Sequence, residues 1–544
     1  MSAVSFSPAR WWPLLLAAVL AVPVTVPAAR RETFPGLSRQ WAYYQSPNFE
    51  LYSTNSERAS RDVLEKMELL RAVFLDTFRL TVRLPQPVTI YYFGEQDDFN
   101  GYLPKSRQGG DVEWAGFCHG DFDRTVITLA PARDRDGARE VVYHEYVHYL
   151  FRITEQNPAT WYNEGVAELF STMEEDDEWL QLGQPVVGRV NDLRHGRMMP
   201  FEQLFAVTQD SPVFRSSGHT GIFYAQSWAF LHYCRFGDNR IPPEKMALFL
   251  RAAASPKAQE KPEQFRVLCK ELLGYDYPRL LEVLQHYITD GRFQGRKVHR
   301  PAIAPKASYV ARPATTEEMT ARLAELSLRF TQSAYANWAI HERVAKQPDS
   351  RLHELLGTVA MQENETDVAR EHWSNAVDLG TTNASTFREL SRLEANRVFS
   401  QFDLDYRLPD ERAARLRSLL RKSVECAPEQ SMGYEMLAWV EATANAPEIA
   451  TINLVQQRFK TLNDKPRTLL ALAMVRFRRG ETQPALEMLD QLDKMNPNEW
   501  TAYGAEITRA RLEKRPVNRE KLNELTSRQT EGFKLVPPNL DPPR

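Results

Sequence analysis

The sequence has little cysteine and no excess of either charge. Its four cysteines, Cys118, Cys234, Cys269 and Cys426, lie far apart and form no Cys-x-x-Cys spacing, which excludes a disulfide framework. We expect buried free thiols, although an exported compartment would permit one bridge. The 68 basic and 71 acidic residues give a net charge of −3, so nothing in the composition indicates a nucleic-acid partner.

General disorder is excluded as well. Hydrophobic residues make up 43% of the chain and charged residues 26%, as in ordinary globular proteins. A single hydrophobic core stops growing at about 250 to 300 residues. A chain of 544 residues is therefore expected to form more than one domain.

An apolar run at the start of the chain is typical of a secretory signal. A basic residue precedes apolar residues 11–26, and small residues follow. This pattern predicts cleavage after Ala28 or Ala29, with residues 1–29 as the signal peptide. The alternative is an uncleaved anchor through residues 11–28, although the run is marginal for the about 20 apolar residues that a membrane span needs. Both interpretations predict export, to the periplasm or outside the cell, with membrane contact only if the segment is retained.

The first part of the chain predicts strands followed by helices. Residues 48–53 alternate as a strand does, and residues 56–78 carry apolar side chains at helical spacing. Residues 88–93 and 125–129 are rich in β-branched and aromatic side chains, which indicates two further strands. The order predicts an α+β fold in which a small sheet packs against the next helix, residues 137–153.

That helix contains the most informative motif, His144-Glu145-Tyr-Val-His148. Successive helical residues turn by about 100°, so the two histidines lie one turn apart on nearly the same face and can bind one metal ion. Glu145 is placed to take a proton from water without binding the metal itself. Three further residues are expected to make core contacts: Val141, Leu150 and Phe151.

The next helix, expected to begin at residues 158–160, offers a third ligand. Catalytic zinc takes three protein ligands and leaves one position to water, and two His with one Glu is an established set. Fifteen residues separate His148 from Glu164, which completes this set. Glu168 lies one turn further on and can accept a hydrogen bond from the free nitrogen of a liganding imidazole. The alternative for Glu168 is an exposed acid.

The two motifs together resemble the gluzincin metallopeptidases, the group that contains thermolysin and aminopeptidase N. Their third ligand is the Glu of an Asn-Glu-Gly or Asn-Glu-Ala turn, which residues 163–165 match. The resemblance implies that the two histidines and Glu164 bind Zn²⁺, that Glu145 is the general base, and that Glu168 is the acidic residue one turn on. It covers residues 45–290.

Two departures narrow what the resemblance implies. The interval between the motifs is shorter than in thermolysin and aminopeptidase N, and the aminopeptidase segment Gly-x-Met-Glu-Asn does not occur, so an aminopeptidase specificity is disfavoured. Bacterial peptidase-MA-like domains are more similar, because a segment like residues 223–229 follows their ligand helices. Within it, Tyr224 is a candidate to donate a hydrogen bond to the oxyanion of the transition state, with a core aromatic residue as the alternative. His219 is a weaker candidate for the same role.

The activity implied is hydrolysis of peptide bonds in protein or peptide substrates. In the gluzincin-like arrangement, residues 125–129 would form the edge of the sheet, along which an extended peptide pairs through its main chain. The competing hypothesis is an exported scaffold in which the metallopeptidase-like domain is non-catalytic or latent. Glu145 argues against it, because a purely structural site has no use for a base beside an open metal position.

The pattern changes towards the C-terminus. Several prolines and no periodicity make residues 293–318 a linker or an extended strap. Further on, small and large residues recur as in tetratricopeptide repeats, and such repeats stack into an all-α solenoid whose concave face binds another protein. The positions that carry this resemblance are Gly357, Ala369, Trp373 and Ala376, then Ala438, Ala450 and Leu454, then Ala473, Ala485 and Leu489. The expected order is a signal peptide (1–29), a metallopeptidase-like domain (30–292), the linker (293–318), the repeats (319–530) and a tail (531–544).

Overall fold

The computed structural model describes most of the chain between residues 33 and 517. The described ranges are 33–82, 86–104, 115–120, 124–131, 135–176, 178–208, 210–215, 217–237, 241–253, 262–299, 309–495 and 497–517. The predicted signal peptide and the predicted tail lie outside the described residues. No described helix is long and apolar enough to cross a membrane.

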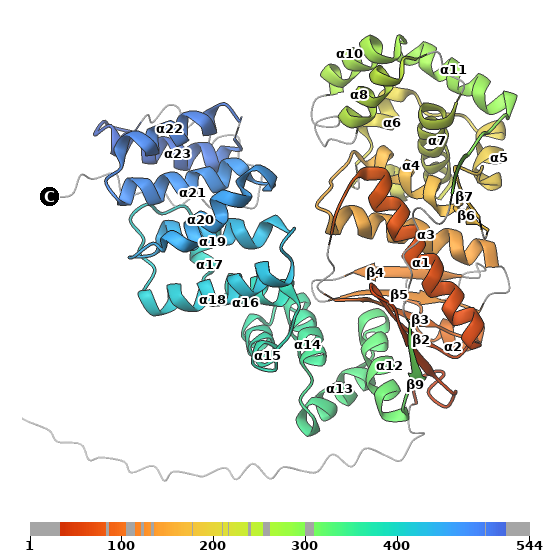
Figure 1. Ribbon diagram of the computed structural model, residues 1–544, viewed down its shortest axis with the longest axis horizontal. Coiled ribbons are helices and arrows are strands. Elements are labelled where there is room, and N and C mark those ends of the chain that lie inside the picture. The colour runs from red at the N-terminus through yellow and green to blue at the C-terminus, as the bar shows by residue number, and fades with distance from the viewer. Residues whose placement is uncertain are drawn as a thin grey trace, which may run out of the picture.

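The fold is mixed α+β, as predicted, and is built on a six-stranded sheet (Figure 1). The strand order is β4-β5-β3-β2-β1-β9. Strand β3 pairs parallel with both β2 and β5. The outer pairs, which are β1 with β2, β1 with β9 and β4 with β5, are antiparallel. The bounds are β1 (Ala42–Gln45), β2 (Phe49–Ser53), β3 (Val88–Tyr92), β4 (Gly116–Gly120), β5 (Thr125–Leu129) and β9 (Val310–Pro313). A smaller antiparallel sheet has the order β6 (Glu174–Glu175), β7 (Trp179–Leu182) and β8 (Arg296–His299).

Helices of the first half of the chain surround these sheets. Their bounds are α1 (Glu57–Phe78), α2 (Gln96–Asn100), α3 (Arg135–Ile153), α4 (Thr160–Ser171), α5 (Val187–His195), α6 (Phe201–Ala206), η2 (Pro212–Arg215), α7 (Ser217–Phe236), α8 (Pro243–Ala253), α10 (Pro262–Leu273) and α11 (Tyr277–Asp290). The predictions for residues 48–53, 56–78, 88–93, 125–129 and 137–153 match β2, α1, β3, β5 and α3 to within two residues at each end. Local periodicity was therefore enough to place the elements around the motif.

Alternation along the strands sends side chains to opposite faces of the large sheet. Phe49 and Leu51 of β2 join the core that contains α1 and α3, and the Phe49 ring lies 5.3 Å from that of Tyr146. Tyr52 instead belongs to the core formed with helices that follow residue 315. Both faces of the sheet are thus covered.

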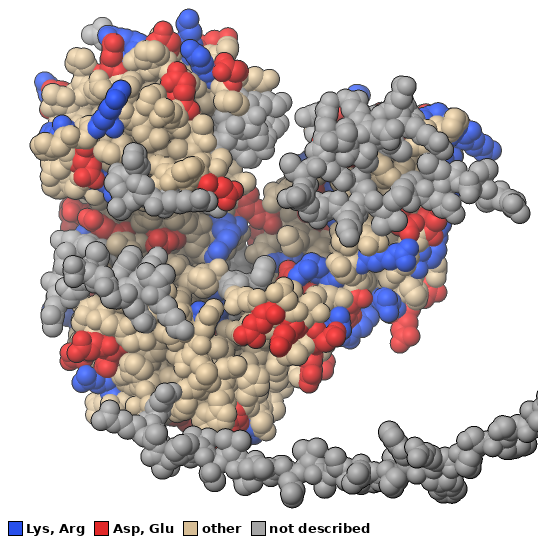
Figure 2. All heavy atoms as spheres, turned by 180° about the vertical axis from the view of Figure 1, so that it is seen from behind, with Lys and Arg blue, Asp and Glu red and all other residues tan. Residues whose placement is uncertain are grey.

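The helices of the second half follow one another from the sheet into a separate lobe (Figure 1). Their bounds are α12 (Thr316–Thr331), α13 (Ala334–Lys346), α14 (Ser350–Gln362), α15 (Thr366–Asp378), α16 (Ala384–Glu394), α17 (Asn396–Ser400), α18 (Asp410–Cys426), α19 (Ser431–Thr443), α20 (Ile449–Arg458), η4 (Phe459–Thr461), α21 (Lys465–Arg478), α22 (Thr482–Asp493) and α23 (Glu499–Leu512). Seen from behind, acidic and basic side chains are interspersed on the exposed surface rather than gathered by sign (Figure 2).

The junction between the two halves differs from the predicted linker. β8 and β9 lie within residues 293–318 and each pairs with a strand from the first half. Helices α12, α13 and α14, expected at the start of the repeats, pack on the sheet face that carries Tyr52. The prolines favoured a segment without regular structure. An edge strand such as β9 tolerates proline, however, and Pro313 occupies its last position.

Helix pairs do occur where the small and large residues recur. Gly357 and Trp373 are in contact, since a Cβ at position 357 would lie 2.4 Å from the Trp373 ring. Ala369 and Ala376 are buried beside them. The expected partner Ala450 is exposed, however, and α20 buries Ile452 and Val455 instead. The pattern located the helices but was out of register at α20.

Two further expectations from the sequence were wrong. The strand β5 is not the sheet edge, because residues 116–120 form β4 and pair antiparallel with it as a hairpin. Val141 is 38% exposed, whereas Leu150 and Phe151 are buried as expected. The buried face of α3 is set by Tyr146, Val147 and Leu150, and position 141 points away from it.

All four cysteines are free thiols.

A buried network of charges joins the sheet to α12 and α14. Arg351 forms an ion pair with Glu50 of β2 and donates to Glu325 at 2.9 Å and to Thr89 of β3 at 3.1 Å. Arg322 reaches the same Glu325 at 2.7 Å. Burial alone would raise the pKa of Glu50, but the positive charges of Arg351 and Arg124 and the hydrogen bonds from Thr89 and Arg351 together outweigh burial and lower the pKa.

We predict that Arg351→Met, which keeps side-chain volume and removes the charge, lowers the free energy of unfolding by about 3–5 kcal/mol, because it removes the ion-pair partner of the buried Glu50 and one of the partners of Glu325. Chemical denaturation at pH 7 measures this loss. Lys346→Met, which breaks the exposed pair with Glu342, is the control and should cost at most about 1 kcal/mol. Because the pKa of Glu50 is lower in the folded protein, its ion pair stabilises the folded state at pH values above the unfolded pKa of the carboxyl group. The difference in the free energy of unfolding between wild type and Arg351→Met should therefore narrow below about pH 4. Equal losses in both variants would contradict this.

Candidate metal centre

The three predicted ligands come together on α3 and α4. His144 and His148 lie one turn apart on α3, and Glu164 lies near the start of α4. The Nε2 atoms of the two histidines are 3.0 Å apart, and each faces Glu164 Oε2, at 3.2 Å from His144 and 3.3 Å from His148. These are the described residues that could hold a metal ion.

The spacing of the three ligand atoms fits a tetrahedral ion. Zinc binds histidine nitrogen and carboxylate oxygen at about 2.0–2.1 Å, which puts two ligand atoms of a tetrahedron about 3.3 Å apart. The observed separations are 3.0, 3.2 and 3.3 Å. Glu164 Oε2 is also buried without a hydrogen bond of good geometry. A buried carboxylate oxygen in this state is costly unless a cation satisfies it, so the residues fit a metal.

Neighbouring side chains orient both imidazoles. His148 Nδ1 lies 2.8 Å from Asn163 Oδ1, so it carries the proton and leaves Nε2 for a metal. His144 Nδ1 faces Glu168 Oε1 at 3.5 Å. Glu168 is itself held by Arg189, which donates to its two oxygens at 2.7 and 3.2 Å. Glu168 is therefore buried against the site rather than exposed.

The pKa values of Glu164 and His148 shift in opposite directions. Burial raises the pKa of Glu164, but the contacts with His144 and His148 outweigh burial and bring it to about 2. Burial lowers the pKa of His148, but the contact with Glu164 outweighs it and raises the pKa to about 9. Glu164 is therefore ionised at neutral pH, and its negative charge favours positive charge beside it.

Gly165, next to Glu164, lets a third helix close on the site. A Cβ at this position would lie 2.7 Å from the main-chain oxygen of Ser227 in α7. Any larger residue would therefore push α7 away from α4. The glycine of the motif has a packing role here that is separate from metal binding.

Helix α7 also brings Tyr224 to the site. Its ring lies 5.9 Å from the His144 ring, and the Arg189 guanidinium lies 5.3 Å from its centre. Burial, followed by the charges of Glu164 and Glu145, raises the pKa of Tyr224, so the phenol keeps its proton. Tyr224 is partly buried beside the ligands rather than in the core. The side chain of His219 lies outside the described residues.

A cavity of about 560 Å³ opens beside the metal-binding side chains. Glu145, His148 and Glu164 line this cavity, and so does Asn463 of the second lobe. The second lobe is held there by Glu155, at the end of α3, whose carboxylate accepts from the Ser431 main-chain nitrogen at 2.7 Å and from the Ser431 hydroxyl. Glu155 thereby caps the N-terminus of α19. The second lobe therefore forms part of the wall of this cavity.

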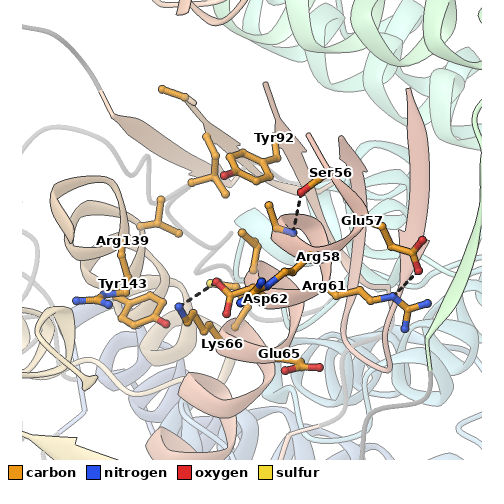
Figure 3. A pocket seen from close by; sticks show the side chains of 16 residues that line it. Ser56, Glu57, Arg58, Arg61, Asp62, Glu65, Lys66, Tyr92, Arg139 and Tyr143 are labelled. Carbon is orange, nitrogen blue, oxygen red and sulfur yellow. Dashed lines mark hydrogen bonds and ion pairs between the residues drawn. The ribbon is translucent and has the colours of Figure 1, made fainter. Parts of the chain in front are cut away.

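A larger cavity of about 1070 Å³ lies at the carboxyl ends of β3 and β5, between α1 and α3, and shares no lining residue with the first (Figure 3). Its charged side chains on α1 largely pair with one another. Arg61 binds Glu57 at 2.9 Å and Lys66 binds Asp62 at 2.9 Å (Figure 3). No metal-ligand group is formed there among the described residues. The 560 Å³ cavity is therefore the candidate functional site.

No protein-family model matches the chain, and no curated protein sequence matches it. The site thus has to be judged by its own geometry. That geometry brings together His144, His148, Glu164, Glu145, Glu168 and Tyr224. The sequence did not predict the roles of two residues at the site. Asn163 belongs to the Asn-Glu-Gly motif, but its contact with His148 was not foreseen, and Arg189 has no recognisable spacing from either motif.

We predict that Glu168→Gln weakens metal binding about 10- to 100-fold, because the neutral amide no longer favours the orientation and basicity of His144. Competition with a chromophoric chelator measures the metal affinity. Glu174→Gln, on the exposed end of β6, is the matched control. A thermal melt of the metal-free proteins separates loss of metal from loss of fold. Unchanged affinity in a folded Glu168→Gln variant would show that Glu168 does not support the ligand.

Proposed function

We propose that the protein is a zinc-dependent metallopeptidase of the gluzincin type that hydrolyses peptide bonds in protein or peptide substrates. The observation that carries the proposal is the convergence of His144 Nε2, His148 Nε2 and Glu164 Oε2 within 3.3 Å of one another. This set leaves a tetrahedral ion one vertex for water or substrate. A zinc ion there would lower the pKa of a water toward about 7 and polarise a carbonyl.

The chain's own residues supply the proton transfers. Glu145 lines the same cavity as His148 and Glu164. In the proposed reaction it takes the proton from the attacking water and gives it to the leaving amine nitrogen. Tyr224 keeps its proton and is the candidate donor to the oxyanion. Asn163 and Glu168 hold the imidazoles in place.

The edge strand β4 is the proposed docking site for the substrate main chain. It is the outermost described strand on its side of the sheet, and it supplies Cys118 and Gly120 to the cavity. Its outer main-chain groups can pair with an extended peptide of loose sequence. We further propose that the protein is exported and that the helix pairs from α14 onward form a tetratricopeptide-like solenoid that binds a protein partner.

We predict that Glu145→Gln retains zinc at one ion per chain and loses peptidase activity at least about 100-fold, because it removes the base and keeps the ligands. His148→Ala should lose both the metal and the activity. The measurements are elemental analysis and cleavage of casein and a peptide library, with and without a chelator.

The outcomes separate the two functions considered. Chelator-sensitive cleavage that Glu145→Gln abolishes supports the peptidase. Zinc at one per chain without cleavage of any substrate would favour the scaffold with a latent metallopeptidase-like domain. Cleavage that is unaffected in Glu145→Gln would refute the role of this residue.

A further inference from the structure

The cavity beside the metal-binding side chains contains one positively charged group that the proposed reaction does not use. Arg152 lies on α3, four residues after His148, and lines the same cavity. On a helix this spacing is one turn, about 6 Å along the axis. Arg152 thus lines the same cavity as His148 and Glu164 without being one of the candidate ligands.

Among the described residues, Arg152 pairs with no carboxylate. It donates to the carbonyl oxygen of Gly120 at 3.2 Å and, more distantly, to the Thr125 hydroxyl at 3.5 Å. Its guanidinium also lies 5.6 Å from the centre of the Tyr149 ring. The acid nearest to it along the chain, Glu155, lies two residues after the end of α3 and accepts hydrogen bonds from Ser431. Arg152 thus keeps donors for a ligand that carries negative charge.

The guanidinium stands at the end of the edge strand. A Cβ at Gly120, the last residue of β4, would lie 1.9 Å from Arg152 Nη2. The absence of a side chain at this position is what lets the guanidinium reach the strand. A peptide paired with β4 would pass this point.

We propose that Arg152 is a specificity-determining residue that binds a substrate carboxylate within about three residues of the bond that is cut. The inference rests on the proposed peptidase function. The limit of about three residues comes from the spacing along α3. Four helical residues rise by about 6 Å, and one residue of an extended peptide spans about 3.3 Å, so this spacing corresponds to about two peptide residues. The fork of an arginine matches a carboxylate with two parallel hydrogen bonds. The carboxylate comes from an Asp or Glu side chain or from the C-terminus of the peptide.

The test uses short fluorogenic peptides of otherwise identical sequence on the full-length protein with zinc. Glu, Gln or Lys is placed at each of three positions on either side of the cut bond, and each peptide is made with a free or an amidated C-terminus. The proteins are wild type, Arg152→Lys, Arg152→Glu and Gly120→Ala. Arg251→Gln, on the exposed face of α8, is the control. Binding to Glu145→Gln protein, alone and combined with Arg152→Glu, is followed by fluorescence anisotropy.

We expect wild type to prefer Glu over Gln at one position, or the free over the amidated C-terminus, by about tenfold in kcat/KM. Arg152→Glu should reverse the preference towards Lys, Arg152→Lys should keep part of it, and Gly120→Ala should weaken it by displacing the guanidinium. A preference at an internal position identifies a side chain as the source, and one at the terminus identifies the C-terminal carboxylate.

Cleavage that is indifferent to charge, or a preference that survives Arg152→Glu, would overturn the inference and leave the peptidase intact. Selective binding of carboxylate peptides that Arg152→Glu abolishes, without cleavage by wild type, would support Arg152 and refute the peptidase. Absence of both binding and cleavage would overturn both proposals.

Discussion

The packing of α4 on α3 is the constraint on which the metal centre depends. A single helix turn aligns His144 and His148, but only the neighbouring helix can bring a carboxylate to both Nε2 atoms at 3.2 and 3.3 Å. Gly165 extends this constraint to α7, because its missing side chain lets the Ser227 carbonyl approach α4. Tyr224 and the ligands thereby share one wall. The three candidate ligands and Tyr224 are therefore positioned by helix packing.

The elements and ligands that sequence predicted correctly are those specified by local periodicity or by a spacing along one helix. Helix α3 needed only its apolar pattern, and His144 and His148 needed only the 3.6-residue turn. Glu164 was placed by the combination of ligand chemistry and a short following helix. The coarse α+β order was equally local, since strands and helices alternate visibly between residues 48 and 153.

What sequence could not predict depends on contacts between distant segments. β9 pairs with β1 although more than two hundred residues separate the two strands in the sequence, and no local pattern predicts such a pairing. The same holds for Arg189, whose approach to Glu168 is decided by how α5 lies against α4. The β5 edge was misplaced for a different reason: β4 begins and ends with glycine and contains no β-branched residue, so its composition does not indicate a strand.

Among the contacts between the first and second halves of the described chain, those on the far face of the sheet and those near the candidate metal ligands bear on the site. On the far face of the sheet, Arg351 links Glu50, Glu325 and Thr89, and such a network is satisfied in only one arrangement of α12 and α14. Near the metal ligands, Glu155 caps α19 through Ser431. Two attachments far apart resist rotation better than one, so the wall that Asn463 contributes to the cavity is held in register with Glu145 and His148. In the proposed peptidase, a substrate that reaches the candidate metal ligands through this cavity would then touch both lobes, so the helical lobe would take part in substrate selection.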